Sequence, residues 1–181
     1  MKELSLHILD IANNSIRAKA NTIQILVTED EEKNLLTIKI EDDGCGMTED
    51  FLKIVKNPGV TTKANPDAGM GIPLFEAECL RCGGGLDIKS VAGTGTEVRA
   101  TFELKHKDRL PIGNMAETMK ALILGSSETE FIYRHIKNGR EFLLDTREIK
   151  KTLDGVPINE TKVLLWIGEY IGEGLGDISK E

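Results

Sequence analysis

A carboxylate followed by two closely spaced glycines is the sequence feature with the clearest chemical use. Asp42, Gly44 and Gly46 lie in the run Ile-Glu-Asp-Asp-Gly-Cys-Gly-Met over residues 40–47. The alternation of apolar and polar residues over 35–40 predicts a β-strand that ends just before Asp42. A carboxylate there can accept a hydrogen bond from the exocyclic amine of an adenine, and glycines let the backbone approach a flat ligand closely. Aspartate and glycine are also common in hairpin turns, so a turn without a ligand is the alternative interpretation.

A second group of polar residues shares one face of a helix predicted over residues 4–20. A buried stripe is predicted from the helical spacing of Ile8, Ile11, Ala12, Ser15 and Ile16. Asp10, Asn14 and Arg17 gather on the opposite face. The amide oxygen of Asn14 suits a hard Mg²⁺ ion, the carboxylate of Asp10 could orient a water molecule, and the guanidinium of Arg17 could hold a phosphate oxygen. The alternative is an ordinary solvated helix face.

The sequence Gly-Met-Gly-Ile-Pro-Leu over residues 69–74 predicts a loop that leads into a helix. Because Gly69 and Gly71 have no Cβ, backbone amides at the start of this helix could surround the phosphates of a nucleotide. The polar residues just before the loop include Thr61, Thr62 and Lys63, and the lysine could reach a terminal phosphate. A polar stretch between ordered elements is typical of a lid over a binding site.

The run Gly-Thr-Gly-Thr over residues 93–96 joins two predicted strands, 86–91 and 97–104. Its composition predicts a hairpin turn. The hydroxyl of Thr96 could share a water molecule with Asp42 beneath a bound base.

In order and spacing, these blocks resemble the ATP-binding domain shared by DNA gyrase, Hsp90, histidine kinases and MutL, the GHKL family. Residues 7–20 resemble its N box, and residues 42–46, 69–71 and 93–96 resemble its three glycine boxes. The match covers about residues 1–104. The resemblance implies an α+β fold, the two-layer α/β sandwich known as the Bergerat fold. It also implies that ATP and Mg²⁺ are the cofactors.

The same resemblance implies roles for single residues. Asn14 would coordinate Mg²⁺, Asp42 would bind adenine, Thr96 would support the base, and residues 61–71 would form the ATP lid. The implied nucleotide site consists of Asn14, Arg17, Asp42, Gly44, Gly46, Met47, Thr62, Gly69, Met70, Gly71, Ile72 and Thr96.

Two positions depart from the family pattern. Asp10 stands where hydrolysing members have glutamate and where sensor kinases usually have asparagine or histidine. Because aspartate is shorter, it could activate water only from a closer helix or through a second water, so slow hydrolysis is expected. Arg17 stands where sensor kinases often have lysine. The lid and the second glycine box resemble the kinase branch, whereas the Asn-Ser and Asp-Gly-Cys-Gly strings are closer to MutL.

Two classes of function follow from the resemblance. In the first, the chain is an enzyme that passes the γ-phosphoryl group of ATP to a partner protein, similar to the catalytic domain of histidine kinases and to anti-sigma serine kinases, with Asp10 and Lys63 as catalytic residues. In the second, it is a nucleotide switch without kinase activity, which slow hydrolysis by Asp10 resets. Both require an unidentified partner protein, and a homodimer is a further arrangement that the sequence leaves open. His7 is expected to be a helix-face residue rather than a phospho-acceptor.

Composition restricts the partners. The chain has 181 residues, of which 40% are hydrophobic and 29% are charged, as in ordinary globular proteins. No apolar run approaches the roughly 20 residues that span a bilayer, and the N-terminus lacks the apolar core of a signal peptide. We therefore expect a cytoplasmic protein with no membrane partner. The net charge of −7, with lysine and arginine scattered along the chain, argues against binding to nucleic acid.

Residues 105–181 predict a small α+β appendage with helices near 114–123, 146–153 and 163–171 and a hairpin at Asn138-Gly139. About 75 residues form a small core, so the appendage is expected to dock on the ATP domain or build a dimer. Trp166 is predicted to be a core residue, with an interface anchor as the alternative.

Cys79 and Cys82 are expected to be small apolar residues near a helix end, with a metal or redox site as the alternative.

Overall fold

The computed structural model describes residues 2–61 and 69–180. Its helices are α1 (Leu4–Arg17), α2 (Glu49–Ile54), α3 (Gly71–Arg81), α4 (Met115–Gly125), α5 (Thr146–Leu153) and α6 (Thr161–Ile178). Its strands are β1 (Thr22–Asp30), β2 (Leu35–Asp42), β3 (Gly85–Val91), β4 (Gly95–Glu103), β5 (Glu130–Lys137) and β6 (Arg140–Asp145). Among the described residues, no helix is both long and apolar enough to cross a membrane.

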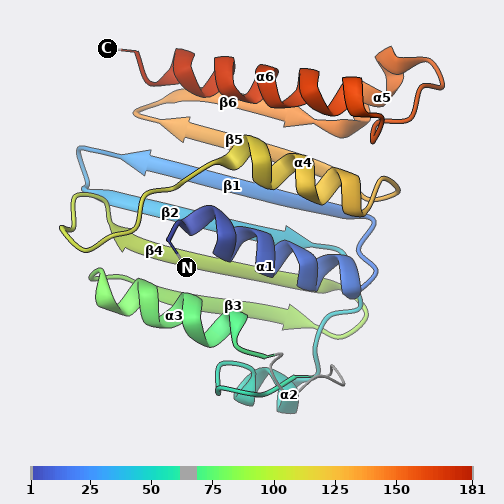
Figure 1. Ribbon diagram of the computed structural model, residues 1–181. Coiled ribbons are helices and arrows are strands. Elements are labelled where there is room, and N and C mark those ends of the chain that lie inside the picture. The colour runs from blue at the N-terminus through green and yellow to red at the C-terminus, as the bar shows by residue number, and fades with distance from the viewer. Residues whose placement is uncertain (1, 62–68, 181) are drawn as a thin grey trace.

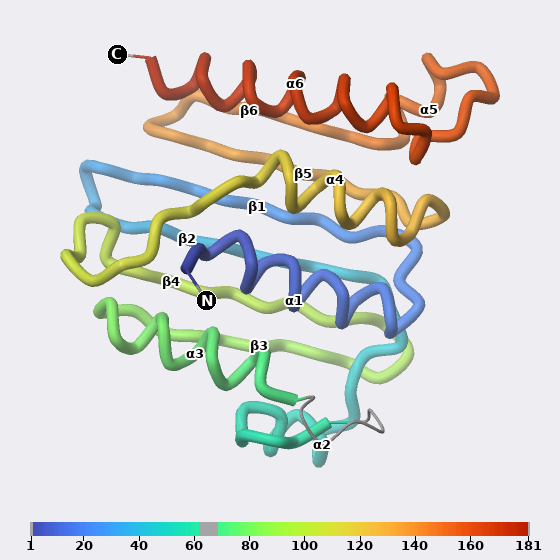
Figure 2. Tube along the Cα trace, viewed as in Figure 1, coloured from blue at the N-terminus to red at the C-terminus, as the bar shows by residue number. Residues whose placement is uncertain are grey.

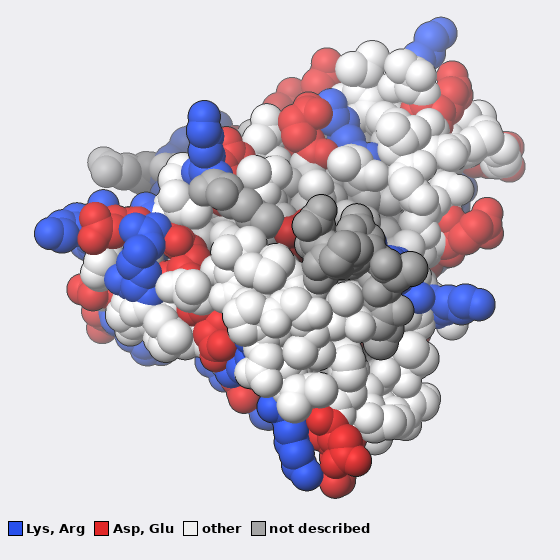
Figure 3. Space-filling model, turned by 60° about the horizontal axis from the view of Figure 1, so that its bottom comes forward, with Lys and Arg blue, Asp and Glu red and all other residues white. Residues whose placement is uncertain are grey.

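The strands form one six-stranded sheet in the order β3-β4-β2-β1-β5-β6. Helices α1, α3, α4 and α6 lie side by side over one face of this sheet, and the tube view shows the same arrangement (Figures 1 and 2). The predicted two-layer α+β sandwich is confirmed. On the side of the molecule that is lowest in Figure 1, charged side chains of both signs lie around a broad area without charged residues (Figure 3).

The core lies between the two layers. In β1 and β2, every second side chain is buried, as a strand with one covered face requires: Ile23, Ile25, Val27, Leu36, Ile38 and Ile40. Helix α1 contributes Leu4, Ile8 and Ile11 to the same core. His7 of α1 is also buried, and its ring stacks on Phe75 of α3 with 4.9 Å between the ring centroids. His7 therefore packs on the face of α1 that meets α3, as expected for a structural residue of this helix.

The glycine-rich segments in the middle of the chain lie at the ends of helices and strands. Strand β2 runs through Asp42, so the prediction that Asp42 lies just past the strand was wrong by two residues. Cross-strand pairing of Asp42 with Thr96 extends the β2–β4 ladder to this point and explains the difference. The hairpin between β3 and β4 and the helix that begins at Gly71 agree with the sequence expectations.

The C-terminal elements also follow their local sequence signals. Asn114 caps α4, because its side-chain oxygen accepts a hydrogen bond from the amide of Glu117 at 3.0 Å. Asn138 and Gly139 both adopt positive φ, +48° and +83°, as the tight β5–β6 hairpin requires.

The C-terminal elements continue the sheet of the N-terminal half. Strand β5 pairs in parallel with β1, from Thr22 opposite Glu130 to Glu29 opposite Lys137. The appendage therefore joins the sheet through backbone pairing. The predicted boundary between residues 104 and 105 stays a prediction.

Trp166 differs from its sequence expectation. Its side chain is 50% exposed on α6, so the prediction of a core residue was wrong. The buried stripe of α6 is formed instead by Val163, Ile167 and Ile171, which repeat every four residues.

Candidate nucleotide site

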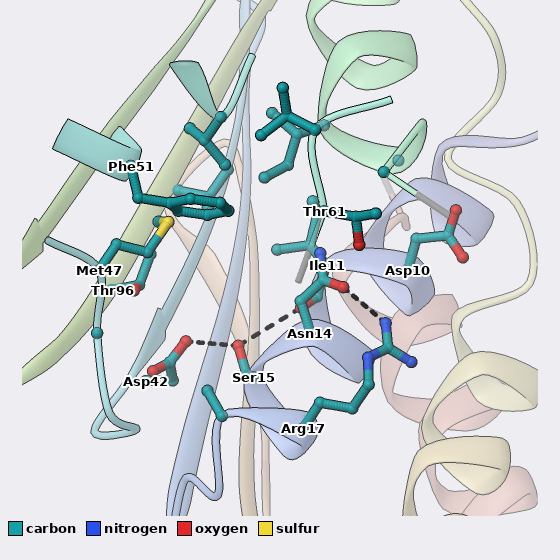
Figure 4. Close-up of a pocket in the computed structure, with 18 of the residues that line it drawn as sticks. Asp10, Ile11, Asn14, Ser15, Arg17, Asp42, Met47, Phe51, Thr61 and Thr96 are labelled. Carbon is teal, nitrogen blue, oxygen red and sulfur yellow. Dashed lines mark hydrogen bonds between the residues drawn. The ribbon is translucent and has the colours of Figure 1, made fainter. Parts of the chain in front are cut away.

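A cavity of about 680 Å³ lies between α1, the end of β2, α2 and the start of α3 (Figure 4). This volume lies within the usual range for pockets that hold small ligands. The cavity brings together most of the residues that the sequence singled out: Asp10, Asn14, Arg17, Asp42, Gly46, Met47, Gly69, Met70, Gly71, Ile72 and Thr96. Thr61 also lines it, whereas Thr62 and Lys63 lie outside the described residues.

Asp42 stands at one end of the cavity with both carboxylate oxygens held in place. Its Oδ1 accepts a hydrogen bond from the amide of Gly44 at 2.9 Å, and its Oδ2 accepts one from the hydroxyl of Ser15 at 2.5 Å. Gly44 therefore lies behind the carboxylate and does not line the cavity. A Cβ on Gly44 would lie 2.9 Å from the Cβ of Ala18, so glycine permits this close packing.

Two hydroxyl residues of this end were not predicted. Ser15 was assigned to the buried stripe of α1, and it is buried, but its hydroxyl faces Asp42 (Figure 4). Ser90 of β3 lies beside Thr96, with 2.8 Å between their side-chain oxygens, and accepts a hydrogen bond from the amide of Met47 at 2.8 Å. For Ser15, the available sequence signal was a serine inside an apolar stripe, directly after Asn14. The strand register that brings Ser90 to Thr96 is visible only in the fold.

Helix α1 presents its polar face to the other end of the cavity. The side-chain oxygen of Asn14 accepts a hydrogen bond from the Arg17 guanidinium at 2.6 Å (Figure 4). Asp10 lies beside the start of α3: a Cβ built on Gly71 would stand 3.7 Å from its carboxylate oxygen. Among the described residues, no side chain caps the N-terminus of α3. Its first amides are thus available to an anion, in the place where the sequence predicted phosphates.

The donor set at this end fits a magnesium ion that binds together with phosphate. Asn14 and Asp10 offer an amide oxygen and a carboxylate, both hard donors. An amide oxygen has two lone pairs, so Asn14 can accept from Arg17 and still face a metal ion. Among the described residues, no group of three or more histidine, cysteine or acidic side chains could hold a metal alone. Mg²⁺ usually keeps several waters and shares its shell with phosphates, which needs only one or two protein oxygens.

Two glycines of the cavity wall are required by the backbone. Gly46 has a φ of +65°, and a Cβ there would collide with the carbonyl of Val91. Gly69 has a φ of +92°, and a Cβ there would lie 2.6 Å from the carbonyl oxygen of Val60. Both positions therefore need the left-handed conformation and the open space that only glycine supplies.

Helix α2 forms an apolar wall that the sequence analysis did not predict. It begins after Thr48, whose hydroxyl accepts a hydrogen bond from the amide of Phe51 at 3.3 Å. Phe51 and Met47 face the cavity above Thr96 (Figure 4). A flat apolar slot beside a carboxylate can hold a heteroaromatic base.

The cysteine pair shows properties of buried apolar residues. Both Cys79 and Cys82 are buried, and burial raises the pKa of the Cys79 thiol to about 12. Burial also raises the pKa of Cys82, whose sulfur lies 3.6 Å from a carboxylate oxygen of Glu78. At neutral pH both thiols stay protonated, a form that binds metals poorly.

Residues 2–106 match the family model described as histidine kinase-, DNA gyrase B- and HSP90-like ATPase. A Shewanella frigidimarina (strain NCIMB 400) protein, described by its name as a sensor protein, is 28% identical over 103 residues. These residues make up 56% of this chain and 16% of that relative, so the chain spans only a small part of its length.

Among solved structures, the Aquifex aeolicus MutL ATPase domain complexed with ADP has a TM-score of 0.52 and 16% identity, over 80% of this chain and 63% of that one. The N-terminal domain of a DNA repair protein has a TM-score of 0.52 and 14% identity, over 80% and 53%. At these identities the likeness establishes the fold.

Proposed function

Since this chain belongs to the family of histidine kinase-, DNA gyrase B- and HSP90-like ATPases, we propose that its cavity binds Mg-ATP and that the nucleotide serves regulatory phosphoryl transfer to a partner protein. One observation carries the proposal. A single cavity is bordered by groups suited to each part of the nucleotide: Asp42 for the base, Asn14 for the metal and the start of α3 for the phosphates. The name of the Shewanella relative, a sensor protein, supports a signalling role.

At the base end, Asp42 selects adenine. Hydrogen bonds from Ser15 and Gly44 fix the carboxylate and leave it further lone pairs directed at the cavity. The exocyclic amine of adenine can donate to such a carboxylate. Guanine would present a carbonyl oxygen at the same position, and two acceptors repel each other. Phe51 and Met47 then pack against the ring.

At the phosphate end, α1 and α3 act together. The amides at the start of α3 and the positive end of its dipole attract the phosphate chain. Asn14 would hold Mg²⁺, which neutralises phosphate charge when bound. Arg17 keeps the Asn14 side chain oriented in this direction and can itself contact a phosphate oxygen. By the family resemblance, Thr62 would also contact the nucleotide and Lys63 would steady the transferred phosphoryl group.

An ATP-dependent switch with slow hydrolysis is the second candidate function. The observation that favours it is the position of Asp10, whose carboxylate lies beside the start of α3. A carboxylate there could orient a water molecule for attack on the terminal phosphate. Hydrolysis without an acceptor would then reset the conformation.

Base recognition is tested by exchanging single carboxyl groups. The two carboxylate oxygens of Asp42 already accept hydrogen bonds from Ser15 and Gly44. Asp42→Asn replaces one of these oxygens with an amide nitrogen, which cannot accept a hydrogen bond, so ATP affinity should fall roughly 10- to 100-fold. Asp43→Asn is the matched control, because Asp43 accepts hydrogen bonds from the amides of Asn21 and Thr22 outside the cavity. Isothermal titration with ATP and GTP measures both. Equal ATP affinities for the two variants would contradict the proposed base site.

The fate of the γ-phosphate separates the two functions. We would incubate the protein with Mg-ATP labelled at the γ-phosphate and an extract of its source cell, with Asp42→Asn as the control. Label on a protein band that disappears with the variant supports the kinase and identifies the partner. Label found only as free phosphate, in a reaction that Asp10→Asn abolishes without loss of ATP binding, supports the switch.

A further inference from the structure

Ser90 of β3 stands behind Thr96, next to the base end of the cavity. Its side-chain oxygen lies 2.8 Å from that of Thr96 and 3.0 Å from the carbonyl oxygen of Gly95, and it accepts a hydrogen bond from the amide of Met47 at 2.8 Å. Ser90 pairs with Thr96 across the β3–β4 ladder, and Thr96 pairs with Asp42 across the β2–β4 ladder. Ser90, Thr96 and Asp42 therefore form one row across the sheet.

The hydroxyl groups of Ser90 and Thr96 can be arranged in two ways. A serine hydroxyl has one proton and two lone pairs, and the Met47 amide occupies one of the lone pairs of Ser90. In the first arrangement, Ser90 donates to the Gly95 carbonyl and accepts from Thr96, which then offers only lone pairs to the cavity. In the second, Ser90 donates to Thr96, whose own proton is then free for the cavity. Ser90 thus decides whether Thr96 acts as donor or acceptor toward a ligand.

A bound adenine would select the second arrangement. In the proposed site, Asp42 accepts a hydrogen bond from the exocyclic amine, and a water molecule beneath the base lies between Asp42, Thr96 and the adjacent ring nitrogen. The carboxylate and the ring nitrogen are both acceptors, so they use both protons of this water. The water can then only accept from Thr96. The Met47 amide strengthens this direction, because hydrogen bonds in a chain polarise one another.

We propose that Ser90 is a positioning residue for adenine recognition, which holds Thr96 as a hydrogen-bond donor to the water beneath the base. The chain of donors runs from the Met47 amide through Ser90 and Thr96 to the water, and each donor has one acceptor. This inference rests on the proposed nucleotide function. It assigns a role in base recognition to a strand, β3, that contributes through a side chain behind the cavity wall (Figure 4 shows Met47 and Thr96).

An ATP analogue with C–H in place of this ring nitrogen, 1-deaza-ATP, tests the proposal. Isothermal titration gives the ratio of the two affinities for each variant, and a general loss of stability or of phosphate binding cancels in this ratio. The wild-type chain should prefer ATP roughly tenfold, the effect of one hydrogen bond. Ser90→Asp can accept from Met47 but cannot donate to Thr96, so it should reduce the preference to about twofold or less. Ser90→Thr retains a hydroxyl and should keep the preference.

Further variants separate the direction of the hydrogen bond from other effects. Ser90→Ala, which removes the donor without adding charge, should also lower the preference. Thr96→Val should lower it as well, and Ser90→Ala added to Thr96→Val should lower it no further, because both residues act through one water. Ser126→Ala is the matched control: Ser126 forms the same kind of hydroxyl pair with Thr129, at 2.7 Å, in the connection between α4 and β5. Its preference should equal that of the wild type.

The outcomes distinguish a failure of this inference from a failure of the nucleotide function. If the wild type binds ATP but shows no preference over the analogue, or if Ser90→Asp and Ser90→Ala keep the full preference, Ser90 does not position Thr96. An equal loss of preference in Ser126→Ala would also overturn the proposal. A wild type that binds neither nucleotide would instead contradict the proposed nucleotide function, and this inference with it.

Discussion

At the scale of single residues, Ser15 connects helix α1 to the carboxylate proposed to recognise adenine. Its hydroxyl donates to Asp42 across 27 residues of sequence, and its side chain is 3% exposed. A buried donor of this kind keeps the carboxylate in one rotamer before a ligand arrives. Sequence periodicity identifies Ser15 as buried but cannot identify its partner, because the partner lies on another element.

Ser15→Ala should weaken ATP binding roughly 10- to 100-fold, since a hydrogen bond to a charged group contributes roughly 1.5–3 kcal/mol. Ser5→Ala is the matched control: Ser5 is a buried serine of the same helix, and its hydroxyl donates to Glu3 at 3.0 Å, away from the cavity. Isothermal titration with ATP measures the affinities, and thermal unfolding shows that both variants are folded. Equal loss of affinity in the two variants would mean that Ser15 acts only through helix stability.

At the scale of elements, the sequence predicted those helices and hairpins that carry a local sequence signal. Helix α1, the β3–β4 and β5–β6 hairpins and α4 to α6 all carry periodicity, a cap or an Asn-Gly turn. Helix α2 was missed because its six residues are too few for a periodic pattern, although Thr48 was an available cap signal. The exposure of Trp166 was also missed, because a helix face becomes core or surface only through its neighbours. The residues lining the cavity were mostly predicted, because the family motifs name them directly.

Lys56, which follows α2 in the chain, connects this segment to α3 and β3. Lys56 donates to the carboxylate of Glu76 in α3 at 2.7 Å and to the carbonyl of Leu86 in β3 at 2.5 Å. Lys56→Met should loosen α2 and weaken ATP binding several-fold, because Phe51 of α2 lines the cavity; the half-exposed ion pair itself is worth at most about 1 kcal/mol. Hydrogen exchange of the amides of residues 49–54 measures the loosening. Lys53→Met, which removes only an exposed pair with Asp50, should leave exchange unchanged.

At the scale of the whole molecule, the sheet joins two parts that the sequence separates. The predicted ATP-binding half ends with β4, yet β1 lies in the interior of the sheet because β5 covers its other edge. The pairing joins residues more than 100 positions apart, from Thr22 with Glu130 onward. Local patterns predict strands but not the strands with which they pair. From the sequence we could therefore expect only that the appendage docks on the ATP domain or builds a dimer. Side chains reinforce the junction: Glu29 of β1 lies 2.7 Å from the ring of His135 in β5, whose other nitrogen lies 2.7 Å from the Tyr133 hydroxyl.

This junction predicts that the chain unfolds as one cooperative unit. Trp166 is the single tryptophan, so its fluorescence follows α6, whereas far-ultraviolet circular dichroism follows all helices and strands. Both signals should give the same midpoint in urea, because loss of β5 would expose the edge of β1 and the buried side chains of Phe131 and Tyr133. Glu29→Gln should lower both midpoints together. Two separate midpoints would instead show that residues 105–181 fold independently of residues 1–104.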